Sequence, residues 1–330
     1  MEGHEGTPTA VARPLTGTIV PAHSVGAPAS KPPVSTSDHP ESGQDLQRPG
    51  RRRPHFPLLA PMFVMGFETF QKQGRILRSD EAEAKGLLEE FDARRHIAIF
   101  ISHRWWEQSS AGAGEDDGHP DYTTGEKENL KFRTICVGVE ELIEECDLDS
   151  GKVVLWMDWF CIAQDDAERK LSSIKSLIKY VTLCEFMLIP AETEEAFTAR
   201  GYVDPGPDNI PGYGERAWCR LEWFIFMLWS ELEGAAGVHL YAVNLEGVLH
   251  RYPRLQIYVD SQKPDAGGLS LEKDRPFIRA LQEDMRAASV SSAIQRQAGG
   301  AEMDLGAKML SDSEVPELVH VLRQVRNVCM

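Results

Sequence analysis

The sequence predicts an α/β protein with a doubly wound parallel sheet of four to five strands and helices on both faces. Short, continuous apolar runs alternate with longer segments whose apolar residues recur at the helical period. The runs lack a polar alternation, which is typical of strands covered on both faces in a parallel sheet. All seven tryptophans lie between Trp105 and Trp229, so the core is expected there. Such alternation predicts right-handed crossovers between parallel strands.

Residues 1–55 are predicted to form a disordered tail. They are rich in Pro, Ser, Thr, Gly and Ala and almost free of aromatic residues, so they bury too little apolar surface to offset the loss of chain entropy. Arg51–Arg53 is either a localisation or docking signal or, more simply, solvated charge.

Residues 56–96 are expected to be a helical lead-in to the main domain. An apolar cluster runs from Phe56 to Phe70. A helix is expected from Asp80 to Arg95, because Asp80 and Glu83 have the spacing of a capping box.

The α/β domain is expected over residues 97–262, followed by a polar, helical C-terminal extension over 263–330. The apolar runs predict strands at Ile97–Ser102, Lys152–Asp158, Glu185–Pro190 and Val238–Val243, with a fifth around Leu255–Val259. Apolar periodicity predicts helices over 126–147, 167–183 and 213–233. The proline-containing loop 191–212 is long enough to indicate a lid or an insertion.

Composition excludes several classes of protein. A net charge of −16 argues against a nucleic-acid partner, because a polyanion is repelled over most of the surface. No apolar run reaches about 18 residues and no hydrophobic leader follows Met1, so we expect no membrane association and a cytoplasmic location. Six scattered cysteines without a CxxC pair suit reduced, buried thiols. No glycine-rich phosphate loop is present, which disfavours a Rossmann or P-loop nucleotide site.

Polar residues stand where the predicted strands end. Ser102–Trp106 follows the first strand and Asp158 ends the second, and open α/β sheets bind ligands at the carboxyl ends of their strands. Further along, Glu222 lies near the start of a predicted apolar helix, between Trp218 and Trp223. This carboxylate is either a solvated surface group or one placed for a task.

The arrangement resembles the Toll/interleukin-1 receptor (TIR) domain. The resemblance covers about residues 97–245 and is carried by Phe100–Ser102, Trp156–Asp158, Tyr213, Trp218–Cys219 and Glu222. A second segment, Leu155–Asp166, is similar to the Trp-x-Asp-x-x-Cys-Ile-x-Gln-Asp pattern of fungal heterokaryon-incompatibility domains, which look like relatives of the TIR fold. The resemblance implies a flavodoxin-like sheet.

The TIR resemblance also implies an activity and a site. Many members act in immune or stress-type signalling and hydrolyse NAD between nicotinamide and ribose, with NAD as substrate rather than cofactor. Because nicotinamide leaves as a neutral molecule, one carboxylate can suffice to stabilise the oxocarbenium-like transition state. By resemblance that carboxylate is Glu222. Trp218 and Tyr213 would shape the pocket, and Ser102 and Arg104 would face the ribose or the phosphates.

A non-catalytic alternative stays open. The chain has His103–Trp106 where plant members carry Phe-Arg-Gly-Glu-Asp, and the loop 191–212 is longer than usual. These departures, with the long flanks, also fit a signalling or scaffold module that self-associates as a homo-oligomer through the loop Phe160–Lys170. The expected partners are therefore NAD or a related nucleotide and further copies of this chain.

Several of these residues also have simpler interpretations. Trp218 and Cys219 fit core packing, and Asp158 fits a hydrogen-bond acceptor at a strand end. A Cys161–His103 nucleophile pair is possible in principle, although Cys161 stands in apolar surroundings that favour packing. Four residues could be considered as metal ligands: His103, His119, Asp121 and Cys161. Their spacing fits no zinc pattern, so we expect no metal site.

Overall fold

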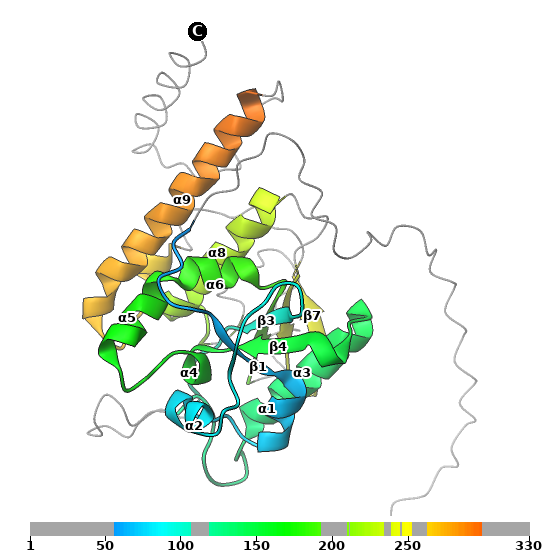
Figure 1. Cartoon of the computed structure of the whole chain (residues 1–330). Coiled ribbons are helices and arrows are strands. Elements are labelled where there is room, and N and C mark those ends of the chain that lie inside the picture. The colour runs from blue at the N-terminus through cyan, green and yellow to red at the C-terminus, as the bar shows by residue number, and fades with distance from the viewer. Residues whose placement is uncertain are drawn as a thin grey trace, which may run out of the picture. The chain divides into compact units, whose positions relative to one another are not determined.

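A computed structural model describes seven parts of the chain, all within one compact unit that spans Gln47–Met330. The described residues are 56–106, 119–192, 210, 212–233, 239–244, 246–252 and 263–298 (Figure 1). The expected disordered tail 1–55, the expected strand at Leu255–Val259 and nearly all of the loop 191–212 lie outside them.

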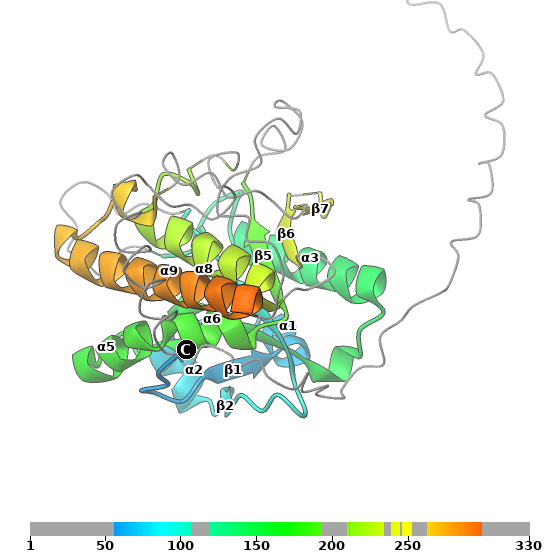
Figure 2. The ribbon, with the colours of Figure 1, turned by 90° about the horizontal axis from the view of Figure 1, so that it is seen from above.

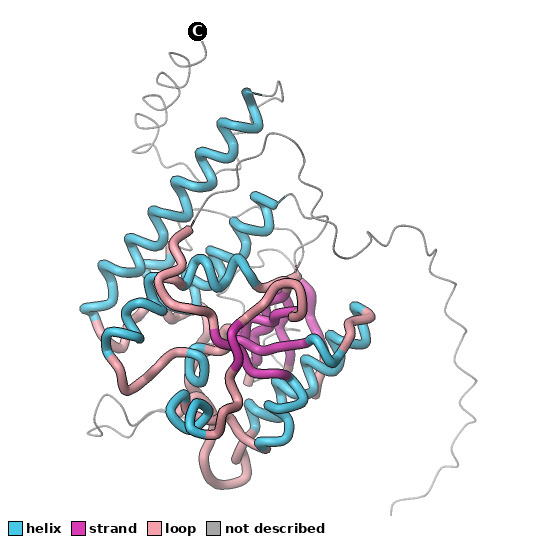
Figure 3. The backbone as a smooth tube through the Cα atoms, viewed as in Figure 1, coloured by secondary structure: helices cyan, strands magenta, loops and turns pink. Residues whose placement is uncertain are grey.

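The protein is a mixed α/β structure around a seven-stranded sheet of order β2-β1-β4-β3-β5-β6-β7 (Figure 3). The strands are β1 (Phe63–Gly66), β2 (Glu89–Glu90), β3 (Ile97–Ile101), β4 (Val153–Trp156), β5 (Phe186–Pro190), β6 (Leu240–Val243) and β7 (Leu249–Arg251). The four central strands β4, β3, β5 and β6 are parallel to one another. The outer strands β1, β2 and β7 pair antiparallel.

Each of the four apolar runs expected to form a parallel strand does so. In the centre, Ile99 of β3 is in register with Leu155 of β4 and with Phe186 of β5. All residues of β4 and β5 are buried. Burial on both faces explains why these strands are continuously apolar.

The expected helical lead-in differs from the structure, and together with the antiparallel strand β7 it makes the sheet larger than expected. Residues 56–96 contribute the strands β1 and β2, and β1 pairs with β4. The helix expected from Asp80 to Arg95 is wrong: α2 covers only Ser79–Ala84. Gly86, with a φ of 64°, turns the chain out of the helix.

The expected capping box at that helix is also absent. The N-cap of α2 is Arg78, which makes no side-chain cap hydrogen bond. Glu83 instead binds Arg169 of α5 (Ala167–Lys175), with contacts of 3.2 and 3.3 Å.

Helices cover both faces of the sheet. α1 (Phe67–Gln73) and α3 (Leu130–Cys146) pack together, with the rings of Phe70 and Phe132 4.9 Å apart. On the other face α6 (Leu177–Leu183) contacts α8 (Ala217–Glu233), and α9 (Arg275–Ala298) lies along α8 (Figures 1 and 2). In the described ranges, no helix is both long enough and apolar enough to span a membrane.

The expected helix 167–183 is divided at Ser176 into α5 and α6. The Ser176 hydroxyl accepts hydrogen bonds from the backbone N–H groups of Leu59 and Ala60, at 2.8 and 3.2 Å. It therefore fastens the beginning of the described chain to this face of the protein.

The residues before α9 hold the start of α8 in place. Gly268 exchanges backbone hydrogen bonds with Glu215 and Ala217, at 2.7 and 2.9 Å. A Cβ atom on Gly267 would come within 2.5 Å of the Ala217 nitrogen, so only glycine permits this approach. The contact positions the helix that carries Glu222.

Candidate active site

Three of the residues singled out in the sequence meet at the carboxyl end of β3. Ser102 directly follows β3, Tyr213 lies just before α8, and Glu222 lies on α8. The Ser102 hydroxyl donates a hydrogen bond to Glu222 Oε2 and lies 2.5 Å from Tyr213 Oη. Tyr213 Oη also donates to the backbone oxygen of Cys219 at 3.2 Å. We call Ser102, Tyr213 and Glu222 the acid cluster.

The topology explains why the cluster forms there. β3 lies between β4 and β5, so the chain leaves β3 toward one neighbour and later returns to the other. At such a switch point the loops part at the carboxyl ends of the strands, which is where open α/β sheets bind ligands. A polar residue follows each of β3, β4 and β5 within two positions at this edge: Ser102, Asp158 and Glu192.

Glu222 is buried, and its proton affinity is unusual. Only 9% of its surface is exposed, and Ser102 is fully buried. Burial, followed by the nearby Asp158 carboxylate, raises the pKa of Glu222 to about 8. The hydrogen bond from Ser102 and the charge of Arg216 act in the opposite direction. In the free protein at neutral pH this carboxyl group therefore keeps its proton.

A second polar group adjoins the cluster and contains a residue that the sequence analysis missed. His103 Nε2 lies 2.9 Å from Asp158 Oδ1, and Lys131 Nζ lies 3.3 Å from His103 Nδ1. Lys131 is fully buried, donates to the backbone oxygens of Arg104 and Pro120, and stands 4.7 Å from the centre of the Trp106 ring. No local pattern indicates this, because a lysine in the first turn of a helix is ordinarily solvated.

Burial and then the Lys131 charge lower the pKa of His103, although Asp158 opposes them. The pKa of Asp158 is also lowered: burial acts to raise it, but the His103 interaction and the Arg216 charge outweigh burial. The Asp158 side chain is 45% exposed, so this acid meets solvent.

Arg104 is held at the end of the neighbouring strand. Its guanidinium forms an ion pair with Glu192 at 2.9 Å, and Glu192 also accepts from Tyr122 and Lys127. A Cβ atom on Gly212 would lie 2.7 Å from Arg104 Cζ, so the guanidinium packs on the glycine backbone. Arg104 thus lies outside the hydrogen bonds of the acid cluster.

The hydrogen bonds of Trp218 and Cys219 lead in different directions. The indole N–H of Trp218 donates to Asp274 Oδ2 at 3.3 Å, just before α9. The Cys219 thiol donates to the backbone oxygen of His103 at 3.4 Å and is buried. Cys219 therefore packs beneath the site, and Trp218 connects α8 to the C-terminal segment.

The Cys161–His103 pair is not formed. The Cys161 thiol is directed at the backbone oxygen of Leu155, 3.9 Å away, and burial raises its pKa. The two ring nitrogens of His103 already have other partners, including Asp158 and Lys131. A thiolate nucleophile is therefore not favoured here.

Asp121, one of the residues considered as a metal ligand, has a different role. Its carboxylate accepts hydrogen bonds from the backbone N–H groups of Tyr122, Lys131 and Phe132, at 2.8, 2.8 and 2.7 Å. It thereby satisfies the free N–H groups at the start of α3. Within the described part of the chain, no three His, Cys, Asp or Glu side chains converge on a point that could hold a metal ion.

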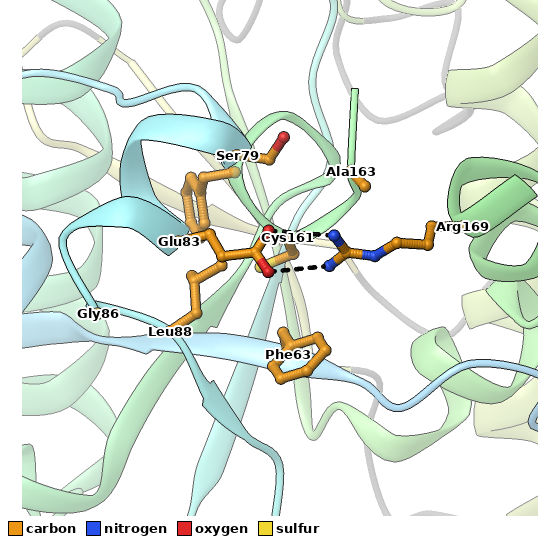
Figure 4. Close-up of a pocket in the computed structure, with 9 residues that line it drawn as sticks. Phe63, Ser79, Glu83, Gly86, Leu88, Cys161, Ala163 and Arg169 are labelled. Carbon is orange, nitrogen blue, oxygen red and sulfur yellow. Dashed lines mark hydrogen bonds and ion pairs between the residues drawn. The ribbon is translucent and has the colours of Figure 1, made fainter. Parts of the chain in front are cut away.

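Two adjoining cavities, of about 90 and 430 Å³, lie elsewhere, between β1, α2, α4 (Asp158–Cys161) and α5. They share the lining residues Phe63, Cys161, Ala163 and Arg169. The ion pair between Glu83 and Arg169 spans the smaller one (Figure 4). No residue of the acid cluster lines either cavity.

Comparison with models of protein families, with curated proteins and with solved structures found no match to this chain. The fold and the side chains at the carboxyl edge of the sheet are therefore what a functional proposal has to rest on.

Proposed function

We propose that the protein is a TIR-like NAD⁺ nucleosidase, which hydrolyses the bond between nicotinamide and ribose, with Glu222 as the essential carboxylate. The observation that carries the proposal is the hydrogen bond from Ser102 to Glu222. These residues are 120 positions apart, and the TIR resemblance assigns both to one site.

The order of the central strands supports the same family of folds. Counted along the chain, the four parallel strands are arranged second, first, third, fourth. This is the beginning of the flavodoxin-like order. On this proposal, β1, β2 and β7 are antiparallel additions to a flavodoxin-like core.

The proposed hydrolysis requires from the protein mainly one negative charge near the ribose. When the bond between C1′ and nitrogen breaks, its electron pair stays with nicotinamide, which leaves neutral, and positive charge develops on the ribose. An ionised carboxylate in a water-poor site stabilises that charge. The cationic pyridinium ring of bound NAD⁺ favours ionisation of Glu222, because an opposite charge nearby lowers a carboxyl pKa.

The other predicted site residues take supporting roles. Ser102, which Tyr213 contacts, orients the Glu222 carboxylate. In the proposed complex a ribose hydroxyl and Ser102 both donate to this carboxylate. Arg104 is the proposed contact for the diphosphate and has to leave Glu192 to make it. Trp218 shapes the pocket by anchoring α8 through Asp274.

Nicotinamide release by the purified full chain tests the proposal. The assay compares wild type, Glu222→Gln and the control Glu141→Gln, which changes an exposed glutamate on α3. High protein concentration and a crowding agent favour any assembly that turnover requires. We expect release by wild type and by the control, and a loss of about 10²- to 10³-fold in Glu222→Gln. Full activity in Glu222→Gln would show that Glu222 is not the essential carboxylate.

A second candidate function is a non-catalytic signalling or scaffold module that self-associates. It is favoured by the acid cluster itself, because Ser102 is fully buried and its hydroxyl is already hydrogen-bonded to Glu222. The segment Phe160–Lys170 would be the contact surface, and Gln164 holds it in shape by donating to the backbone oxygen of Asp158 at 3.1 Å. Concentration-dependent mass in light scattering, abolished by Glu168→Arg, without nicotinamide release would support this function.

A further inference from the structure

The hydrogen-bonded side chains of Lys131, His103 and Asp158 form the best-defined polar group that the proposed role of Glu222 does not use. It begins in α3, passes the end of β3 and reaches the first residue of α4, directly beyond β4. Its two links measure 3.3 Å, from Lys131 Nζ to His103 Nδ1, and 2.9 Å, from His103 Nε2 to Asp158 Oδ1.

The contacts of Lys131 define its charge. Three groups lie within hydrogen-bond distance of Nζ: the backbone oxygens of Arg104 and Pro120, and His103 Nδ1. An ammonium group has three N–H donors, whereas a neutral amine has two. The face of the Trp106 ring beneath it also favours a cation. Burial lowers the pKa of Lys131 well below its usual range, and the charges of Asp121 and Asp158 oppose that shift. With three partners and the Trp106 ring around Nζ, we take Lys131 as an ammonium that directs one N–H at His103 Nδ1.

The Asp158 carboxylate defines the tautomer of His103. Because an ionised carboxylate only accepts hydrogen bonds, the ring proton is on Nε2, which donates it to Asp158 Oδ1, and Nδ1 accepts from Lys131. In the opposite tautomer, Nδ1–H would donate to the Arg104 oxygen, 3.2 Å away. That oxygen already accepts from Lys131, and the Nε2 lone pair would then face the carboxylate. The chain thus holds Asp158 as an anion with one oxygen fixed.

The Asp158 carboxyl is also partly open to solvent. Its side chain is 45% exposed, whereas that of His103 is 2% exposed. Glu222, the acid of the cluster, is 9% exposed. The anion that the buried chain orients is therefore open to solvent beside the carboxyl that the proposed reaction requires.

We propose that Asp158 is the base that activates the attacking water, with His103 and Lys131 as positioning residues. This inference rests on the proposed NAD hydrolysis. The water oxygen forms a bond to ribose C1′, one water proton passes to Asp158, and the pair of the C1′–nitrogen bond leaves with neutral nicotinamide. Asp158 then returns the proton to solvent. A positioned base contributes about 10²- to 10⁴-fold to such a step.

The first measurement is the kinetics of nicotinamide release from NAD by the full chain. Asp158→Asn is expected to lower kcat by about 10²- to 10⁴-fold and to change KM by less than about twofold. The matched control is Asp149→Asn, because Asp149 lies near the opposite end of β4, where it contacts Gly151 and Lys152. The control is expected to retain wild-type kcat and KM.

Sodium azide separates water activation from a structural role. Azide is an anionic nucleophile that needs no base, so it should restore nicotinamide release in Asp158→Ala and form ADP-ribosyl azide. It should not restore release in Glu222→Ala, which lacks the stabilising carboxylate. An inactive Asp158→Ala that azide does not rescue would overturn the inference.

The outcomes distinguish this inference from the proposed function. Wild-type activity in Asp158→Asn, with loss in Glu222→Gln, would overturn the base and leave the nucleosidase in place. Absence of nicotinamide release from wild type would overturn both.

The positioning chain has its own readout. In ¹⁵N-histidine NMR, with His103→Gln used for assignment among the 10 histidines, we expect His103 as the neutral Nε2–H tautomer. Lys131→Met is expected to remove that preference. A doubly protonated or Nδ1–H ring in wild type would contradict the proposed positioning of Asp158 by His103 and Lys131.

Discussion

Asp158 and Glu222 share one edge of the sheet, and their pKa values are displaced in opposite directions. Burial and the Asp158 charge raise the pKa of Glu222 to about 8. For Asp158, burial is outweighed by His103 and Arg216, so its pKa is lowered. Two carboxyl groups with opposite displacements differ in environment, which is the usual basis for giving two acids different roles in one site.

The first prediction concerns stability. A carboxyl with a raised pKa keeps its proton when folded and loses it when unfolded, so stability is fully present below about pH 4.5 and is lost as the pH rises to about 8. Glu222→Gln removes this loss. Relative to wild type, its free energy of unfolding is expected to gain up to about 4 kcal/mol between pH 5 and pH 8. Urea denaturation at four pH values measures it.

The matched control for this prediction is Glu141→Gln, which changes an exposed residue of α3. Its difference from wild type is expected to be independent of pH. A Glu222→Gln difference that is equally flat would show that Glu222 titrates as an ordinary surface acid.

The second prediction concerns the pH profile of NAD cleavage. In the proposed reaction the transition state requires an ionised Glu222, and the ratio kcat/KM reports ionisations of the free enzyme. This ratio is therefore expected to rise about tenfold per pH unit below pH 7 and to level off above pH 8, with an apparent pKa near 8. Nicotinamide release between pH 5.5 and 9 measures it. A profile that falls with rising pH would contradict the role of Glu222.

The third prediction concerns Asp121, which closes the start of α3. Asp121→Ala leaves three backbone N–H groups without their acceptor, those of Tyr122, Lys131 and Phe132. Loss of a helix cap together with buried, unsatisfied donors is expected to cost about 2–4 kcal/mol of the free energy of unfolding. Asp149→Ala, at an exposed 3₁₀ turn, serves as the comparison and should cost much less. Equal losses in the two variants would contradict the capping role.

The fourth prediction concerns the packing of α3 on β6. A Cβ atom on Gly138 would lie 2.8 Å from Val243 Cγ1. Gly138→Ala gains helix propensity but overpacks this contact, so a net loss of about 1–2 kcal/mol is expected. In the Val243→Ala background the same substitution should be neutral or stabilising, which a double-mutant cycle by urea denaturation detects. Additive effects would contradict the steric account.

The local sequence pattern was sufficient to predict the central strands of the sheet and the helix α3. A strand buried on both faces has to be continuously apolar, and a helix against a sheet has to repeat its apolar residues at the helical period. The runs that became β3, β4, β5 and β6 therefore needed no tertiary information. Local pattern failed at β1 and β2, because strands of four and two residues gain their pairing from distant segments.

The candidate site could also be predicted only in part from the sequence. The spacing of Tyr213 and Glu222, and the position of Ser102 at a strand end, were visible in the sequence, and the fold brings all three together. The role of Lys131 was not visible, because its three acceptors come from residues up to 28 positions earlier in the chain.

The sequence by itself determined the four central strands, the helix α3 and the acids that lie near strand ends, because these follow from the periodicity of neighbouring residues. The tertiary structure alone decided the proton affinities. The pKa of Glu222 is raised because the fold buries it near Asp158, and the pKa of Asp158 is lowered because His103, which follows β3, contacts it. Burial and through-space charge depend on residues far apart in the chain, so no local pattern encodes them.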